Sequence, residues 1–422
     1  MRRFLLCLLS TVIVVSVHAQ RECHQQDYQQ QLLSANPLLA REFEKVEAFT
    51  RNLPLTAISG INGSDPAYNV PQLIKIPVVI HVLYNNASQN ISDAQIMSQL
   101  DALNNDFRGR NTDRSKTPAY FADLSTDAGF QFELAKIDPQ GYATTGIIRK
   151  YTGIQNFSYD DRVKNSAIGG DDAWDADSYL NIWVCNTVGG ILGYASAPGG
   201  PKEKDGVVLS AGVFGTIGIG GPFNKGRTAV HEVGHWLNLR HIWGDGYCGD
   251  DKVEDTPPQR SANRGCPTGE KFTCTPTAHG DMYMNYMDFV DDACMVMFTG
   301  GQKERMRSLF APGGARHALL SSKAMSGEGM PKPAPVQPEA PVAEVKLLLF
   351  PNPAVSSITL QSGEDMNCLG KAVQVYNHLG QIMTTTIIKS FNQQINVSSL
   401  RSGIYYVKVE GSARGMAKFV KQ

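Results

Sequence analysis

The 422-residue sequence lacks any excess of charge, because 39 Lys and Arg stand against 40 Asp and Glu. This balance gives no electrostatic reason to expect a nucleic acid or an anionic membrane as partner. After residue 19 the sequence also lacks an apolar run of transmembrane length. We therefore predict no nucleic-acid partner and no membrane span in the processed protein.

Cysteine is scarce, and no paired Cys-x-x-Cys motif of the kind that holds structural zinc is present. Four of the 8 cysteines crowd into one loop-rich region, namely Cys248, Cys266, Cys274 and Cys294. Two disulfides are expected there, and the sequence alone allows three pairings.

Residues 1–19 have the pattern of a signal peptide, and an exported protein can form disulfides. Arg2 and Arg3 form a positive start, residues 4–17 are apolar, and Ala19 ends an acceptable cleavage site. A short membrane anchor is the alternative, but the apolar run is too short to span a bilayer comfortably. We predict a cleaved signal peptide and a soluble protein outside the cytoplasm, where disulfides form.

The most informative stretch runs from His231 to His241, with the sequence His-Glu-Val-Gly-His-Trp-Leu-Asn-Leu-Arg-His. Residues four apart share one face of a helix, so His231 and His235 can point at one metal ion. Glu232 lies beside that face, where a base for an attacking water is wanted. His241 reaches the same ion only if the chain turns after His235. Asn238 suits such a turn, because Asn tolerates the left-handed conformation.

Catalysis explains this motif better than packing does. Three neutral histidines with an open fourth position form a catalytic zinc site, whereas structural sites are usually closed. A buried helix with hydrogen-bonded core histidines is the alternative, but three histidines and a glutamate at these spacings rarely coincide by chance.

The hydrophobic pattern predicts an α/β catalytic domain at residues 51–324, with a central mixed sheet and a helix that carries the histidines. Strands are expected at 75–82, 130–137, 180–185, 192–196 and 206–210, and helices at 92–107, capped by Ser92, and from Thr228 onward. Residues 20–50 are Gln-rich and helix-prone, which is typical of a pro-segment.

A proline-rich linker is predicted at residues 325–345, where five prolines lie between Pro331 and Pro341. Beyond it, alternating segments predict a small all-β sandwich over residues 346–422. Its strands are expected at 357–360, 372–376, 381–388, 394–397, 403–409 and 416–420.

Three further features are candidates for function. Met287 lies about 50 residues after His235, as the Met-turn beneath a metzincin zinc site does; an unrelated core methionine is the alternative. The acidic loop at 250–256 either holds calcium or is solvated. Cys23 can supply a thiolate to the open zinc position and keep the enzyme latent, or it is an unpaired or adventitiously bridged thiol.

The histidine motif, followed by Asn-Tyr-Met-Asp-Phe-Val-Asp-Asp-Ala-Cys-Met at 285–295, resembles the pappalysin family of metzincin metalloendopeptidases, especially its secreted bacterial ulilysin-type members. The resemblance implies zinc bound by His231, His235 and His241, with Glu232 as general base and acid and Met287 in the Met-turn. It also implies a preference for Arg or Lys directly after the scissile bond.

The same resemblance implies three structural features. The disulfides are Cys248–Cys274 and Cys266–Cys294. The calcium ligands are Asp251, Val253, Asp255 and Thr256. The edge strand that pairs with the substrate backbone comprises Leu192, Gly193, Tyr194 and Ala195.

Two positions depart from the family pattern. Asn238 replaces the usual Gly, which its tolerance of the left-handed conformation makes harmless. Phe289 stands where relatives often carry a Tyr, and it cannot stabilise an oxyanion. Tyr283 and Tyr286 are the candidates to substitute.

The C-terminal region resembles the sorting domain recognised by the type IX secretion system. The matching motifs lie at 349–353, 377–380, 400–405 and 418–422. An accessory sandwich that binds substrate or carbohydrate is the alternative.

Together these features predict a secreted zinc-dependent endopeptidase of proteins and peptides, made as a latent zymogen and activated by a cut near Thr50–Arg51. Zinc and calcium are the expected cofactors, and the type IX machinery is an expected partner. The alternatives are a secreted adhesin with a structural zinc site, against which Glu232 argues, and an exopeptidase.

Overall fold

The computed structural model describes residues 23–53, 70–275, 277–331, 347–361, 369–390, 392–410 and 416–422. The predicted signal peptide and most of the predicted linker lie outside these residues. The chain divides into two compact units, residues 1–332 and 333–422. No helix in the described part of the chain is long and apolar enough to cross a lipid bilayer.

The first unit is built on a six-stranded mixed sheet in the order β2-β1-β4-β6-β5, with β3 also paired to β1. The strands are β1 (Ile74–Tyr84), β2 (Phe130–Leu134), β3 (Ile147–Tyr151), β4 (Leu180–Cys185), β5 (Gly193–Ala195) and β6 (Val207–Ser210). All pairs are parallel except β5 with β6, and β5 forms the outer edge. The predicted mixed sheet is confirmed. β3 was not predicted, because its residues are only half-buried and alternate weakly.

Two helices cover one face of this sheet. The Ser92 side chain caps α4 (Asp93–Phe107) by accepting a hydrogen bond from the Gln95 amide at 3.1 Å, which is worth about 1 kcal/mol. α6 (Arg227–Trp236) begins one residue before the predicted Thr228. The apolar residues of both helices pack in one core with the even-numbered residues of β1, since side chains alternate across a strand.

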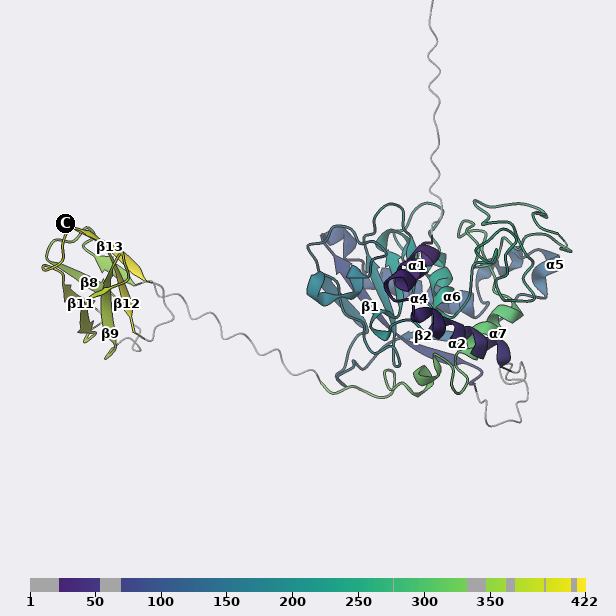
Figure 1. Ribbon diagram of the computed structural model, residues 1–422, viewed down its shortest axis with the longest axis horizontal. Helices are drawn as coiled ribbons and strands as arrows, with labels where there is room; N and C mark the ends of the chain where they lie inside the picture. The colour runs from purple at the N-terminus through teal and green to yellow at the C-terminus, as the bar shows by residue number, and fades with distance from the viewer. Residues whose placement is uncertain are drawn as a thin grey trace, which may run out of the picture. The chain divides into compact units, whose positions relative to one another are not determined.

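The pro-segment forms two helices, α1 (Gln25–Ala35) and α2 (Leu39–Asn52), dark purple in Figure 1. Tyr28 and Leu32 of α1 pack on the opposite face of the sheet, against Trp183, Tyr194 and other residues of that face. α2 contributes Val46 and Phe49 to the main core. The predicted boundary between residues 50 and 51 therefore falls inside a packed helix.

The other helices in the described part of the unit are α5 (Ala119–Ala122), α7 (Gly300–Ser308) and the short 3-10 turns 87–89, 112–116, 162–164, 166–168, 202–204, 211–213 and 317–321. α7 was not predicted. It begins with a capping box in which Thr299 and Gln302 satisfy each other's backbone amides.

The end of the unit corrects the predicted linker boundary at residue 325. The carbonyl of Ala324 accepts hydrogen bonds from the amides of Lys136 and Ile137 at 2.8 and 3.0 Å. The Met330 amide donates to Gly141 at 2.9 Å, and its carbonyl accepts from Ala143 at 2.8 Å. These backbone bonds make residues 324–330 part of the catalytic unit.

The second unit is a β-sandwich, as predicted. One sheet has the order β10-β9-β12-β13 and the other β11-β8-β7. The strands are β7 (Leu348–Phe350), β8 (Ser357–Gln361), β9 (Ala372–Asn377), β10 (Ile382–Ile387), β11 (Asn392–Asn396), β12 (Gly403–Val409) and β13 (Ala417–Lys421). Residues of both sheets, including Leu360, Val375 and Phe419, form its core. β7 was not predicted.

Candidate active site

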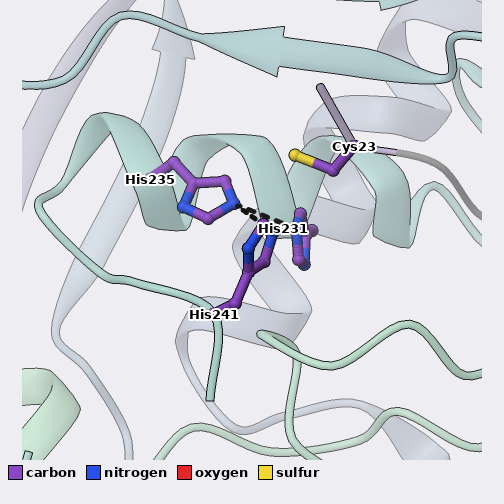
Figure 2. A group of neighbouring side chains, drawn as sticks. All are labelled: Cys23, His231, His235 and His241. Carbon is purple, nitrogen blue, oxygen red and sulfur yellow. Dashed lines mark hydrogen bonds between the residues drawn. The ribbon is translucent and has the colours of Figure 1, made fainter. Parts of the chain in front are cut away.

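Three imidazole rings converge on one point (Figure 2). His231 and His235 project from α6, and the chain then turns at Asn238, whose φ of 74° is the predicted left-handed conformation. The Nε2 atom of His235 lies 3.1 Å from the Nε2 atoms of both His231 and His241. Tetrahedral zinc with Zn–N bonds of about 2.0–2.1 Å places its ligands about 3.3 Å apart. The spacing fits one zinc ion.

The other ring nitrogen of each histidine, Nδ1, lies at hydrogen-bond distance from an oxygen atom. Nδ1 of His231 lies 2.7 Å from the carbonyl of Tyr286, and Nδ1 of His235 lies 2.9 Å from the carbonyl of Leu239. Nδ1 of His241 pairs with the carboxylate of Asp245. Because an oxygen can only accept, each Nδ1 carries the proton and each Nε2 keeps a lone pair for a metal. Burial, followed by the neighbouring His241, lowers the pKa of His235 to about 3.

Sequence reasoning missed these orienting groups. Asp245 lies four residues after His241, and that spacing was the one signal that could have found it. The two backbone carbonyls leave no signal in the sequence.

Glu232 lies beside the edge strand β5, buried at 1% exposure. A Cβ atom on Gly193 would lie 2.8 Å from Cγ of Glu232, so only glycine lets β5 approach this closely. Leu192, just before β5, accepts a hydrogen bond from the Ser210 amide at 2.9 Å. The structure thus brings the predicted substrate edge next to the predicted base.

Cys23 of the pro-segment reaches the same point. Its Sγ lies within 4.8 Å of the ligand nitrogens of all three histidines, and Figure 2 shows it turned toward the rings. It also lies 3.6 Å from Oε2 of Glu232, to which the thiol donates. Its backbone forms a parallel bridge with Gly193. The thiol therefore occupies the place where a fourth ligand would stand.

Met287 lies directly beneath α6 and is fully buried. A Cβ atom on Gly234 would lie 2.6 Å from its Sδ, which explains the glycine between the two helical histidines. The Met287 carbonyl accepts a hydrogen bond from Ile242 at 3.2 Å, next to His241. Met287 therefore contacts both α6, which carries His231 and His235, and the segment after the turn, which carries His241.

Neither tyrosine proposed to replace the missing phenol faces the histidines. The Tyr283 hydroxyl donates to the carbonyl of Gly269 at 3.2 Å, and the Tyr286 ring lies 5.6 Å from the Arg227 guanidinium. Phe289 instead packs its ring against His231 and His241, with centroids 5.5 and 4.9 Å apart. Phe289 thus contributes apolar packing against two of the three histidines.

The four clustered cysteines form Cys248–Cys274 and Cys266–Cys294, with Cα separations of 5.9 and 5.6 Å. This is the pairing that the family resemblance implies.

The acidic loop brings three of its four candidate calcium ligands together. The Thr256 hydroxyl lies 2.8 Å from both Oδ2 of Asp251 and the Val253 carbonyl. Burial raises the pKa of the Asp251 carboxyl to about 7. Asp255 points elsewhere: it accepts hydrogen bonds from Thr299 and from the Gly301 amide at 2.7 and 2.8 Å, at the start of α7.

A second pro-segment contact involves the turn that carries the third histidine. Glu47 of α2 accepts two hydrogen bonds from Arg305, at 3.0 and 2.6 Å, and one from Arg240 at 3.3 Å. Arg305 also donates to the Asn238 carbonyl at 2.7 Å. The sequence offered no signal for this link across 258 residues.

The comparisons with known proteins agree with this site. The peptidase M43 family, described as pregnancy-associated plasma protein-A, matches residues 162–311, and the secretion system C-terminal sorting domain matches residues 348–422. An extracellular metalloprotease of Pyricularia oryzae is 30% identical over 317 residues, which cover 72% of this chain and 93% of that protein.

Two solved structures from Tannerella forsythia are also similar. Mature mirolysin in complex with a cleaved peptide is 52% identical with a TM-score of 0.58, covering 59% of this chain and 96% of that one. A promirolysin mutant is 45% identical with a TM-score of 0.64, covering 71% of this chain and 97% of that one.

The protein is therefore a secreted metalloendopeptidase made with a propeptide. The chain belongs to the pappalysin family, peptidase family M43, and ends in a sorting domain for type IX secretion. These matches decide against a secreted adhesin and against an accessory carbohydrate-binding sandwich.

Proposed function

We propose that the protein is a zinc-dependent endopeptidase whose metal ligands are His231, His235 and His241. One observation carries the proposal: each Nδ1 atom is committed to an oxygen acceptor, so three Nε2 lone pairs face one point. Imidazole nitrogens suit zinc, whereas calcium and magnesium prefer oxygen ligands. Zinc bound there supplies a Lewis acid and lowers the pKa of water.

Glu232 is the group that moves protons in this proposal. Its carboxylate takes a proton from the attacking water and returns it to the leaving amine. Met287 supports the histidines from below. The backbone of Gly193, Tyr194 and Ala195, preceded by Leu192, pairs with an extended substrate as an added strand. The pappalysin resemblance supports a preference for Arg or Lys directly after the scissile bond.

Latency in this proposal depends on Cys23, whose thiol lies among the histidines and contacts the catalytic carboxylate. The Thr50–Arg51 bond lies within the last turn of α2, and the Thr50 hydroxyl lies 3.1 Å from that of Ser308. A cut there would first require the helix to unwind. We keep the activating cut near this bond, after local unwinding, because no Arg or Lys lies between Arg51 and Lys75 to direct self-processing elsewhere before β1.

Calcium is proposed at the acidic loop, through Asp251, the Val253 carbonyl and Thr256. The raised pKa and burial of Asp251 support a cation at this place. In the proposed site Asp255 acts by fixing the loop to α7 rather than with its carboxylate, because both of its oxygens are already bonded there.

The test is cleavage of casein and of Arg-containing peptides, with cut sites mapped by mass spectrometry. The proposal expects internal cuts before Arg or Lys that a zinc chelator abolishes. Glu232→Ala should lose cleavage and self-processing while keeping one zinc per chain by elemental analysis. Glu203→Ala, an exposed glutamate outside the site, is the control. Persistent self-processing of pure Glu232→Ala would contradict the role of Glu232, and cuts only at chain ends would indicate an exopeptidase.

A further inference from the structure

Tyr28 of the pro-segment fills a slot that the catalytic part of the chain provides. The side chain is buried at 1% exposure. Its hydroxyl donates to Oδ2 of Asp161 and accepts from Nζ of Lys164, both at 3.1 Å. The Tyr28 ring packs against the Tyr194 ring with centroids 4.8 Å apart, and Nζ of Lys164 lies 4.8 Å from the centroid of the Tyr28 ring. Both the ring and the hydroxyl of Tyr28 are thus recognised.

The polar end of the slot, formed by Lys164 and Asp161, has other contacts besides those with Tyr28. Nζ of Lys164 also lies 3.0 Å from Oδ1 of Asp161 and donates to Ser196 and to the Lys204 carbonyl, at 3.2 and 2.8 Å. The side chains of Lys164 and Asp161 are only 1% and 8% exposed. When the pro-segment leaves, Lys164 and Asp161 stay paired with each other but lose the Tyr28 hydroxyl as a hydrogen-bond partner. Buried polar groups favour a ligand that restores such a bond.

The slot lies along the substrate edge. Cys23 bridges to Gly193 at the histidines, and the Gln25 side chain accepts a hydrogen bond from the Ala195 amide at 3.0 Å. Tyr28 follows, beside Tyr194 and on the sheet face opposite α6. The pro-segment therefore covers, in order, the metal position, an edge amide and the slot.

An extended substrate on the same edge would reach the same places. Successive side chains of a strand point to opposite faces of a sheet, so one of them is directed toward the slot. Antiparallel pairing is the slightly more stable arrangement. A substrate that runs antiparallel to β5 and has its scissile bond near Gly193 places its N-terminal part beside Ala195. The substrate residues beside Ala195, and those that precede them, therefore lie on the N-terminal side of the scissile bond.

We propose that the slot vacated by Tyr28 becomes a substrate subsite of the activated enzyme, which selects tyrosine on the N-terminal side of the scissile bond. Phenylalanine fills the slot less well, because it cannot bond to Lys164 and Asp161. The subsite rests on the proposed endopeptidase function and adds a second determinant of specificity, on the other side of the cut from the basic residue.

The experiment uses the activated enzyme and quenched fluorescent peptides with Arg directly after the scissile bond. Tyr, Phe, Leu or Ala is placed in turn at each position from two to five residues before that bond. At one position, Tyr should raise kcat/KM about tenfold over Ala, mainly through KM, with Phe in between.

Lys164→Met removes the donor to the phenol and should bring the Tyr-to-Phe ratio close to one. Lys202→Met changes an exposed lysine on the neighbouring turn and should leave the ratio unchanged. If Lys164→Met does not fold, the wild-type peptide series decides alone. Cleavage of the Ala peptides without a preference for Tyr at any position would overturn the subsite and leave the endopeptidase standing. Failure to cleave any peptide would overturn both.

Discussion

Replacing Glu47 by Gln should loosen the pro-segment. The Glu47 side chain is 13% exposed and its partner Arg305 is 5% exposed, while Arg240 is 41% exposed. Losing one member of a buried pair costs about 3–5 kcal/mol, and the exposed pair adds at most about 1 kcal/mol. Because Gln keeps one hydrogen bond and Glu47 is not fully buried, we expect about 2–3 kcal/mol. That corresponds to a rise of about 30- to 150-fold in the opening of α2.

Hydrogen exchange measures this opening directly. In a Glu232→Ala background, which should not process itself, exchange of the α2 amides should accelerate by the same factor. The control is Glu42→Gln on the same helix, whose carboxylate pairs with Lys45 and is 49% exposed. Its effect should stay below about twofold. Equal exchange in the two variants would refute the idea that the Glu47–Arg305 pair holds α2.

The same pair predicts a pH dependence. Burial raises the pKa of Glu47, but the hydrogen bonds and charges of Arg305 and Arg240 outweigh it, so the pKa lies below its usual value. The anchoring is therefore complete above the ordinary carboxyl pKa of about 4.3 and is lost as pH falls through the lowered value. Protection of α2 should decline on acidification in the wild type, and Glu47→Gln should lack that component.

Three further predictions follow from other contacts. Cys23→Ala should cleave peptides before any processing is visible on a gel, because the thiol no longer lies among the histidines; a fully latent variant would contradict the switch. Calcium chelation should lower the Tm of the wild type but not that of Asp251→Asn, and equal losses would remove Asp251 from the calcium site. Arg227→Met should lower the free energy of unfolding in urea by about 3–5 kcal/mol, because it removes the ion-pair partner of the buried Asp106 carboxylate and leaves Asp113 paired with Lys225 alone; a loss under about 1 kcal/mol would refute that role.

Local patterns predicted those parts of the fold in which neighbours along the chain decide the conformation. Ser92 begins a helix because its hydroxyl reaches an amide three residues on. Asn238 turns the chain because its side chain tolerates positive φ. The weakly alternating β3 and the short α7 carried too little pattern to be predicted, since packing against distant segments stabilises them.

By itself, the sequence determined the chemistry of the centre: three imidazoles and a carboxylate on a helix and its turn, because a helix aligns residues four apart. Only the tertiary structure decided which nitrogen of each ring faces inward, since one of the acceptors is the Tyr286 carbonyl, 55 residues from His231. It also decided that Cys23, Glu47 and Tyr28 lie on the catalytic unit. Contacts between segments hundreds of residues apart depend on how the chain packs, and no short-range spacing encodes them.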